Sequence, residues 1–251
     1  MKENKQNSSG NIYLLIHGAA HGAWAWRKVV PLLESAGHKA VAIDLPGHGQ
    51  DKSAPDKVSL DDYVQKVVDV AETQSGPIIL IGHSSGGVTI AQVSERLGIE
   101  KVEKLIFLDA FLPNNGESVF SLAGKFLPPA ANEESTFSDS FIFDPTGATF
   151  TFDTTKVSNF LYHDCNQEDQ DFAKENLGPQ PVAPLATPVR VTDAIYGIIP
   201  KFYIVCLNAR NGNMSEMSKN VPTAKTATLR TSHSPFFSDP DALVDLITSL
   251  G

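Results

Sequence analysis

A G-x-S-x-G pattern at residues 82–86 is centred on Ser84. An apolar run at Ile78–Ile81 precedes it, and a helical pattern over Val88–Leu97 follows it. This setting predicts a sharp strand-to-helix turn that holds the Ser84 hydroxyl clear of a sheet, where it could attack an acyl carbon. The amide of Ser85 would then face the oxyanion that the attack creates. The alternative interpretation is an ordinary glycine-rich entry to a helix.

A serine hydroxyl becomes a useful nucleophile only when a base takes its proton. Of the seven histidines, His233 is the best candidate base, because its loop precedes the final expected helix and returns to the sheet edge where Ser84 is expected. The alternative is a solvated loop histidine. His83 adjoins the nucleophile, so its side chain is expected to point elsewhere. His17 and His21 could suggest a metal pair, but no nearby third ligand has a suitable spacing, so we expect no metal site.

The acid that should support His233 is less evident. After the strand expected at Phe202–Cys206, no carboxylate occurs until Glu216. Asn208 in that stretch could hold an imidazole tautomer but could not stabilise an imidazolium by charge. Asp109 ends the apolar strand after the nucleophile helix, where a buried carboxylate is costly unless it is paired. We therefore favour Asp109 as the acid over Asn208 or no acid at all; Asp109 could instead simply cap a turn.

The second oxyanion donor should come from the loop after the first strand. Gly18 lets the backbone approach the site, and the amide of Ala19 is the natural donor. The predicted oxyanion hole therefore consists of the amides of Ala19 and Ser85.

Six apolar runs predict the strands that position these residues: Ile12–Ile16, Ala40–Ile43, Pro77–Ile81, Leu105–Leu108, Lys201–Cys206 and Thr226–Leu229. Helical patterns alternate with them, over Trp24–Ala36, Leu60–Ala71, Val88–Leu97 and from Pro240 onward. This alternation is typical of an α/β fold, in which a mostly parallel sheet has helices on both faces.

The alternation breaks between residues 111 and 199. A structureless loop of that length is improbable inside a compact domain, so we expect an inserted cap over the carboxyl ends of the strands. Residues 11–110 and 200–251 would form the core, and residues 1–10 a flexible lead-in. The insertion contains ten of the 14 phenylalanines. Most are explained by a small core within the cap, and the rest are expected to line an apolar pocket facing Ser84.

Length and composition limit the classes of function that this chain could have. The 251 residues are 41% hydrophobic and 20% charged, which is typical of a globular domain. The net charge of −9 argues against nucleic acid or an anionic membrane as partner. The first ten residues contain no apolar stretch, so we expect that they are not a secretory signal. Cys165 and Cys206 lie far apart, so we expect free thiols in the cytoplasm. The glycine-rich segment lacks G-x-G-x-x-G and a phosphate-loop lysine, so we expect no cofactor.

Taken together, these motifs resemble the α/β-hydrolase fold family, and within it the plant methylesterase and hydroxynitrile lyase branch with its bacterial carboxylesterase relatives. The matching stretches include residues 14–24, 31–38 and 44–49, the segment around Ser84 and the His233 loop. The resemblance implies Ser84 as nucleophile, His233 as base and the amides of Ala19 and Ser85 as oxyanion donors. Relatives in this family are often dimers, so a homodimer is a further expectation.

The resemblance also identifies a departure. In this branch an aspartate follows the strand that ends here at Cys206, whereas this sequence has Asn208-Ala209. Some relatives, such as certain haloalkane dehalogenases, carry the acid after the preceding strand, and Leu108-Asp109-Ala110 is similar to that arrangement. Asp109 gains support by this analogy.

The leading hypothesis is a serine hydrolase that cleaves carboxylic esters of small, largely apolar molecules through an acyl-enzyme intermediate. A hydroxynitrile lyase is one alternative. Such relatives carry a lysine beside the histidine and a threonine after the first-strand histidine, where this chain has Ser234 and Gly18, so the departures favour hydrolysis. The other alternative, prompted by the missing usual acid, is a ligand-binding pseudoenzyme of the same fold.

Overall fold

The computed structural model describes residues 10–127, 136–212, 214–221 and 225–250. Nine of the ten residues of the expected lead-in, 1–9, therefore lie outside the described residues. Six parallel strands form the central sheet in the order β2-β1-β3-β4-β8-β9. In chain order they are β1 (Ile12–Ile16), β2 (Lys39–Ile43), β3 (Ile78–His83), β4 (Val102–Leu108), β8 (Lys201–Cys206) and β9 (Lys225–Leu229). The predicted six-stranded α/β sheet is confirmed.

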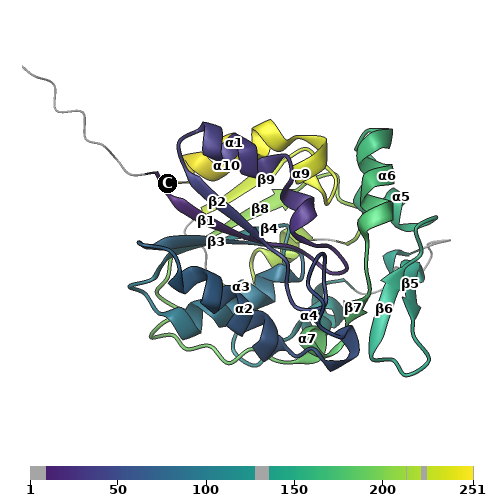
Figure 1. Ribbon diagram of the computed structural model, residues 1–251, viewed down its shortest axis with the longest axis horizontal. Helices are drawn as coiled ribbons and strands as arrows, with labels where there is room; N and C mark the ends of the chain where they lie inside the picture. The colour runs from purple at the N-terminus through teal and green to yellow at the C-terminus, as the bar shows by residue number, and fades with distance from the viewer. Residues whose placement is uncertain (1–9, 128–135, 213, 222–224, 251) are drawn as a thin grey trace, which may run out of the picture.

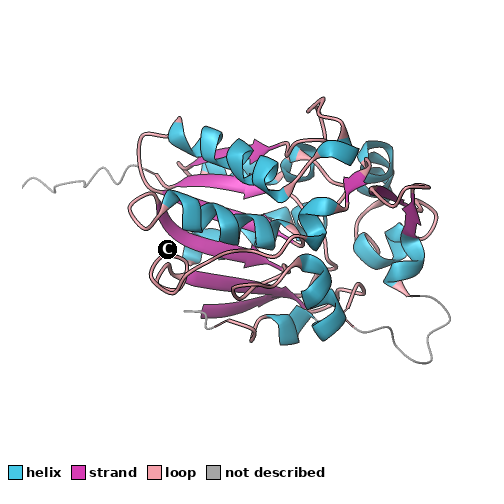
Figure 2. Ribbon diagram, turned by 90° about the horizontal axis from the view of Figure 1, so that it is seen from below, coloured by secondary structure: helices cyan, strands magenta, loops and turns pink. Residues whose placement is uncertain are grey.

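Helices cover both faces of this sheet, which explains why a central strand such as β3 is buried along its whole length. Helices α1 (Val29–Ser35) and α10 (Pro240–Ser249) lie on one face, and α2 (Leu60–Glu72) and α3 (Gly86–Leu97) on the other (Figure 1). The view from below in Figure 2 shows α2 and α3 across the strands. The helix expected over Trp24–Ala36 is interrupted, because a 3-10 turn η1 (Ala23–Trp26) precedes α1.

Residues 111–199, which we call the cap segment, leave the core after β4 and return at β8. Their helices are α4 (Val119–Phe126), η3 (Phe137–Ser140), α5 (Val157–Leu161), α6 (Gln167–Asn176) and α7 (Ala183–Ala186). A three-stranded antiparallel sheet joins β5 (Phe141–Phe143), β6 (Thr149–Phe152) and β7 (Gln180–Pro181). Much of this segment lies beyond the carboxyl ends of the core strands (Figure 1).

Several contacts attach the cap segment to the core, and two of them involve α6 and the residues near the end of the segment. On α6, Asp169 is 1% exposed, and its carboxylate oxygens bind Arg27 Nη2 at 2.7 Å and Lys28 Nζ at 2.6 Å. Farther along, Arg190 N donates to Gln92 Oε1 on α3 at 2.7 Å, and Gln92 Nε2 donates back to Arg190 O at 3.0 Å. The last residues of the cap segment therefore run along α3.

Two further helices complete the core, α8 (Met214–Met217) after β8 and α9 (Pro235–Ser238) before α10. None of the helices in the described ranges is long and apolar enough to cross a bilayer.

Candidate active site

The turn between β3 and α3 holds Ser84 in a strained conformation. Its φ of 52° lies in the left-handed region, which costs a non-glycine residue free energy and is typical of a nucleophile that must stand clear of a sheet. The flanking glycines are required by space. A Cβ at Gly82 would lie 2.6 Å from Gly86 O, and one at Gly86 would lie 2.7 Å from His17 O. The G-x-S-x-G spacing thus fits the tight packing of this turn against the loop after β1.

Hydrogen bonds fix the same turn beside the end of β4. Ser84 N donates to Leu108 O at 3.2 Å, and Phe111 N donates to Ser84 O at 3.0 Å. The residues that flank Asp109 are therefore tied directly to the backbone of Ser84. Asp109 itself has a φ of 43°, so a second non-glycine residue of this region is held in the left-handed conformation.

Asp109 and His233 form a buried pair. His233 Nδ1 lies 2.7 Å from Asp109 Oδ2, and the two side chains are 3% and 0% exposed. The other carboxylate oxygen of Asp109 accepts a hydrogen bond from Cys206 N at 3.0 Å. With Nδ1–H donated to the carboxylate, a neutral His233 has its lone pair on Nε2, and no hydrogen bond to Nε2 occurs within the described ranges. His233 lines the same cavity as Ser84.

Asn208, the alternative acid position, lies elsewhere. It follows β8, and its backbone continues the pairing with the chain after β9 through a bond from Asn208 N to Thr231 O at 3.1 Å. Its exposed side chain donates from Nδ2 to Arg230 O at 3.0 Å. The structure therefore brings Asp109, and not Asn208, to His233.

The two expected oxyanion donors both line the cavity. Ser85 directly precedes α3, so its amide lies at the positive end of a helix. Across residues 10–127, 136–212, 214–221 and 225–250, neither Ala19 N nor Ser85 N donates to another protein group. Both amides are thus free to bind an oxygen that enters the cavity.

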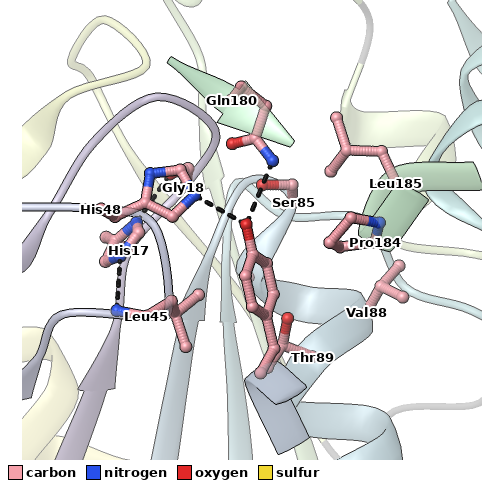
Figure 3. Close-up of a pocket in the computed structure, with 12 residues that line it drawn as sticks. His17, Gly18, Leu45, His48, Ser85, Val88, Thr89, Gln180, Pro184 and Leu185 are labelled. Atoms are coloured by element: carbon pink, nitrogen blue, oxygen red, sulfur yellow. Dashed lines mark hydrogen bonds between the residues drawn. The ribbon is translucent and has the colours of Figure 1, made fainter. Parts of the chain in front are cut away.

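The loop after β1 is held by its own histidine. His17 Nδ1–H donates to Gly18 O at 2.8 Å, and His17 Nε2 accepts from Leu45 N at 3.2 Å (Figure 3). Burial lowers the pKa of His17 to about 4, so the ring is neutral at pH 7 and can fill both roles. Both ring nitrogens of His17 are therefore used within the protein. The described residues contain no group of three or more side chains that could hold a metal ion.

His83 takes a position that sequence reasoning misses, since its side chain is expected to point away. It is buried against the base, with ring centroids of His83 and His233 4.5 Å apart and His83 Nε2–H donating to His233 O at 2.8 Å. Burial lowers its pKa well below the ordinary histidine value, so it stays neutral. His83 therefore fixes the backbone that carries His233; no pattern in the sequence indicates which loop would cover it.

The cavity that Ser84 and His233 share has a volume of about 740 Å³. Seven of the ten phenylalanines of the insertion line it, so more of them face the cavity than expected: Phe111, Phe120, Phe126, Phe137, Phe141, Phe150 and Phe152. Leucine and valine side chains from α4 and α5 add to this apolar wall. Ser84 and His233 therefore both face a cavity suited to apolar molecules.

The thiols do not offer a competing nucleophile. Cys165 and Cys206 are both free and buried. Burial raises the pKa of Cys165 to about 12 and that of Cys206 well above its ordinary value, so both are protonated at neutral pH.

Comparison with known proteins adds to this geometry. Residues 13–246 match the model of a family described as "Alpha/beta hydrolase family". The chain is 31% identical over 251 residues to "Putative methylesterase 11, chloroplastic" of Arabidopsis thaliana, covering 96% of this chain but only 64% of that protein. It is 32% identical over 225 residues to "Salicylic acid-binding protein 2" of Nicotiana tabacum, covering 82% of this chain and 80% of that one. A solved pyrethroid hydrolase from Sphingobium faniae JZ-2 superposes with a TM-score of 0.83 at 27% identity, with 96% of each chain covered.

Proposed function

Because the chain belongs to the alpha/beta hydrolase family, we propose that it is a serine esterase that hydrolyses carboxylic esters through an acyl-enzyme intermediate. The observation that carries the proposal is the buried 2.7 Å hydrogen bond between His233 Nδ1 and Asp109 Oδ2, at the cavity that Ser84 also lines. This bond selects the tautomer in which Nε2 can take a proton from serine.

In the proposed first half-reaction, Ser84 Oγ attacks the acyl carbon while His233 Nε2 takes the hydroxyl proton. The amides of Ala19 and Ser85 bind the oxyanion, and Asp109 stabilises the imidazolium by charge. When the tetrahedral intermediate collapses, His233 returns the proton to the leaving alkoxide, and the acyl group stays on Ser84. In the second half, His233 takes a proton from water while the water oxygen attacks the acyl carbon. When this intermediate collapses, the bond from the acyl carbon to Ser84 Oγ breaks, His233 returns the proton to Ser84 Oγ, and the acid leaves.

The cavity and the relatives support esters of largely apolar small molecules as substrates. A volume of about 740 Å³ is within the range of pockets that enclose drug-sized ligands. The relatives include proteins named as a methylesterase and a pyrethroid hydrolase.

The loop after β1 argues for hydrolysis rather than hydroxynitrile cleavage. The lyase relatives are expected to carry a threonine where this chain has Gly18. A Cβ at Gly18 would lie 2.9 Å from both Ser84 Cβ and His83 Nδ1, so this loop leaves no room for that side chain.

Substitution of the nucleophile tests the proposal. We expect Ser84→Ala to lower the kcat for p-nitrophenyl butyrate by about 10⁴-fold or more, as for other triad serines. Ser35→Ala is the matched control, because Ser35 is exposed and bonds only locally, to Pro31 O. Equal turnover by both variants would contradict the proposal. An inactive wild-type protein that still binds apolar acids would favour the ligand-binding alternative.

A further inference from the structure

We propose that Gln180 is a positioning residue, through which the cap segment aims the oxyanion donor Ala19. This inference rests on the proposed esterase function and deepens it. In this arrangement, residues of both the core and the cap segment position the oxyanion hole, although Gln180 is 160 residues away from Ala20 in the chain.

Ala20, the residue after the donor, has a strained backbone. Its φ of 61° is in the left-handed region, although it is not glycine, so neighbouring contacts must hold it there. The cap segment supplies two of them. Ala20 N donates to Gln180 Oε1 at 2.8 Å, and Gly178 N donates to Ala20 O at 3.0 Å. Because its amide is used in this way, Ala20 cannot serve as an oxyanion donor.

Gln180 has one possible orientation. It is 1% exposed, and its Nε2 donates to Pro181 O at 2.8 Å and to Tyr63 Oη at 3.3 Å. The Tyr63 hydroxyl in turn lies 2.6 Å from His48 Nε2 (Figure 3). Since burial keeps the pKa of His48 well below its ordinary value, His48 is neutral and Nε2 can accept from Tyr63. An amide flip would break these bonds, so Oε1 faces Ala20.

The peptide group between Ala19 and Ala20 is therefore held at both ends. Its N–H is bound by Gln180, and its C=O accepts a hydrogen bond from His21 Nδ1 at 2.8 Å. His21 Nε2 accepts from the Tyr162 hydroxyl at 2.6 Å, and Tyr162 also belongs to the cap segment. Burial lowers the pKa of His21 to about 3, so the ring stays neutral and this pattern of donors persists at neutral pH.

The preceding peptide group carries the donor itself. Its carbonyl oxygen, Gly18 O, accepts a hydrogen bond from His17, which belongs to the core, and its N–H is that of Ala19. A trans peptide points its N–H away from its C=O, so the core bond and the cap bonds together set where the Ala19 amide points. An oxyanion donor is effective only within about 0.2 Å of its ideal distance from the developing charge. Loss of the hydrogen bonds on either the core side or the cap side should therefore destabilise the transition state more than it weakens binding of the ester.

The test compares Gln180→Leu with Gln180→Glu and with Gln92→Leu. Glutamate keeps an oxygen that can accept from Ala20 N, whereas leucine does not. Gln92 is the matched control, because it likewise accepts from a backbone amide and donates to a backbone carbonyl, but at Arg190. For p-nitrophenyl butyrate we expect Gln180→Leu to lower kcat roughly 10- to 100-fold with KM within about threefold, which is less than the loss of a whole oxyanion donor. Gln180→Glu should recover part of the loss, because it keeps the acceptor for Ala20 N but loses the two bonds that Nε2 donates. Gln92→Leu should match the wild type.

A second measurement separates a positioning role from general destabilisation. A trifluoromethyl ketone forms a covalent hemiketal, in which Ser84 Oγ bonds to the carbonyl carbon, the π electrons move to oxygen as an oxyanion, and the serine proton goes to His233. The matching methyl ketone binds without forming this adduct. We expect Gln180→Leu to weaken the binding of the trifluoromethyl ketone by the same factor that it lowers kcat/KM. The affinity for the methyl ketone should stay within about threefold of the wild-type value.

Equal weakening of both ketones, or a Gln180→Leu kcat within threefold of wild type, would overturn the inference. If Gln180→Leu does not fold, Gln180→Met keeps the side-chain length and is judged by the same results. A wild-type protein that neither turns over the ester nor forms the adduct would instead overturn the proposed esterase function.

Discussion

Asp109 reaches His233 because it ends β4, and β4 pairs with β8 while β8 pairs with β9. The loop after β9 carries His233, so a carboxylate at the end of β4 is only one strand farther from it than one after β8 would be. The buried carboxylate has two hydrogen-bond donors, Cys206 N and His233 Nδ1. These offset the cost of burying a charge there.

Asparagine at position 109 tests whether this charge supports the base. We expect Asp109→Asn to lower kcat by several hundred-fold or more, because the amide cannot stabilise an imidazolium and can hold the wrong tautomer. Steady-state kinetics with p-nitrophenyl butyrate would measure it. Asn208→Ala, at the alternative position, should stay within about twofold of wild type. If Asn208→Ala lowered kcat several hundred-fold and Asp109→Asn stayed within about twofold of wild type, the acid would have to come from the turn after β8.

Sequence reasoning can propose Ser84 and Asp109 because each follows a strand whose apolar run is evident, and His233 because its loop precedes the final helix. It cannot predict Gln180, Tyr162 or His83 as supports. Their partners are backbone atoms in distant loops, such as Ala20 N for Gln180. Those contacts exist only after the cap segment has packed on the core, and no local spacing encodes them.

At the scale of elements, central strands such as β1, β3 and β4 are predictable because they are largely apolar runs buried from both sides. The elements of the cap segment are not. Strands β5 and β6 are short, and their alternating phenylalanines pack on one another and on Phe137 of η3. The ring centroids of Phe141 and Phe150, for example, lie 4.8 Å apart. Their pairing is decided by tertiary packing around the cavity, which local propensity does not predict.

Removal of one charge should loosen the attachment of α6. Asp169 is 1% exposed and binds both Arg27 and Lys28. We expect Asp169→Asn to lower the free energy of unfolding by about 1–3 kcal/mol, the usual cost of breaking a buried charged hydrogen bond. Urea unfolding would measure the change.

The control for this prediction lies on the same helix. Asp171 is half exposed and pairs with Lys174 at 3.3 Å, so Asp171→Asn should change the free energy of unfolding by less than about 0.5 kcal/mol. Equal effects of the two substitutions would mean that α6 responds to net charge and not to the buried contact.

For the whole molecule, buried histidines predict a loss of stability in mild acid. Burial lowers the folded-state pKa of His17 to about 4 and of His21 to about 3, against 6.5 when unfolded. Between these values the unfolded chain binds more protons, so the free energy of unfolding is highest above pH 6.5 and falls as pH falls toward 4. For these two histidines we expect a loss of about 2 kcal/mol between pH 6 and pH 5.

Urea unfolding at pH 7, 6 and 5 would measure this dependence. Proton uptake on unfolding at pH 5, followed in weakly buffered solution, should reach about two protons or more per molecule. A free energy of unfolding that stays constant from pH 7 to pH 5 would show that these rings are not held neutral in the fold.

The expected homodimer and cytoplasmic location stay predictions.

The most direct test of the whole account is the rate at which a fluorophosphonate modifies Ser84, located by peptide mass spectrometry. The probe needs a serine oxygen activated by a base, and it makes no demand on the identity of the natural ester. We expect rapid stoichiometric labelling of Ser84 in the wild type and labelling slower by about 10³-fold or more in His233→Ala. Labelling at another residue, or a rate at Ser84 that is the same without His233, would contradict it.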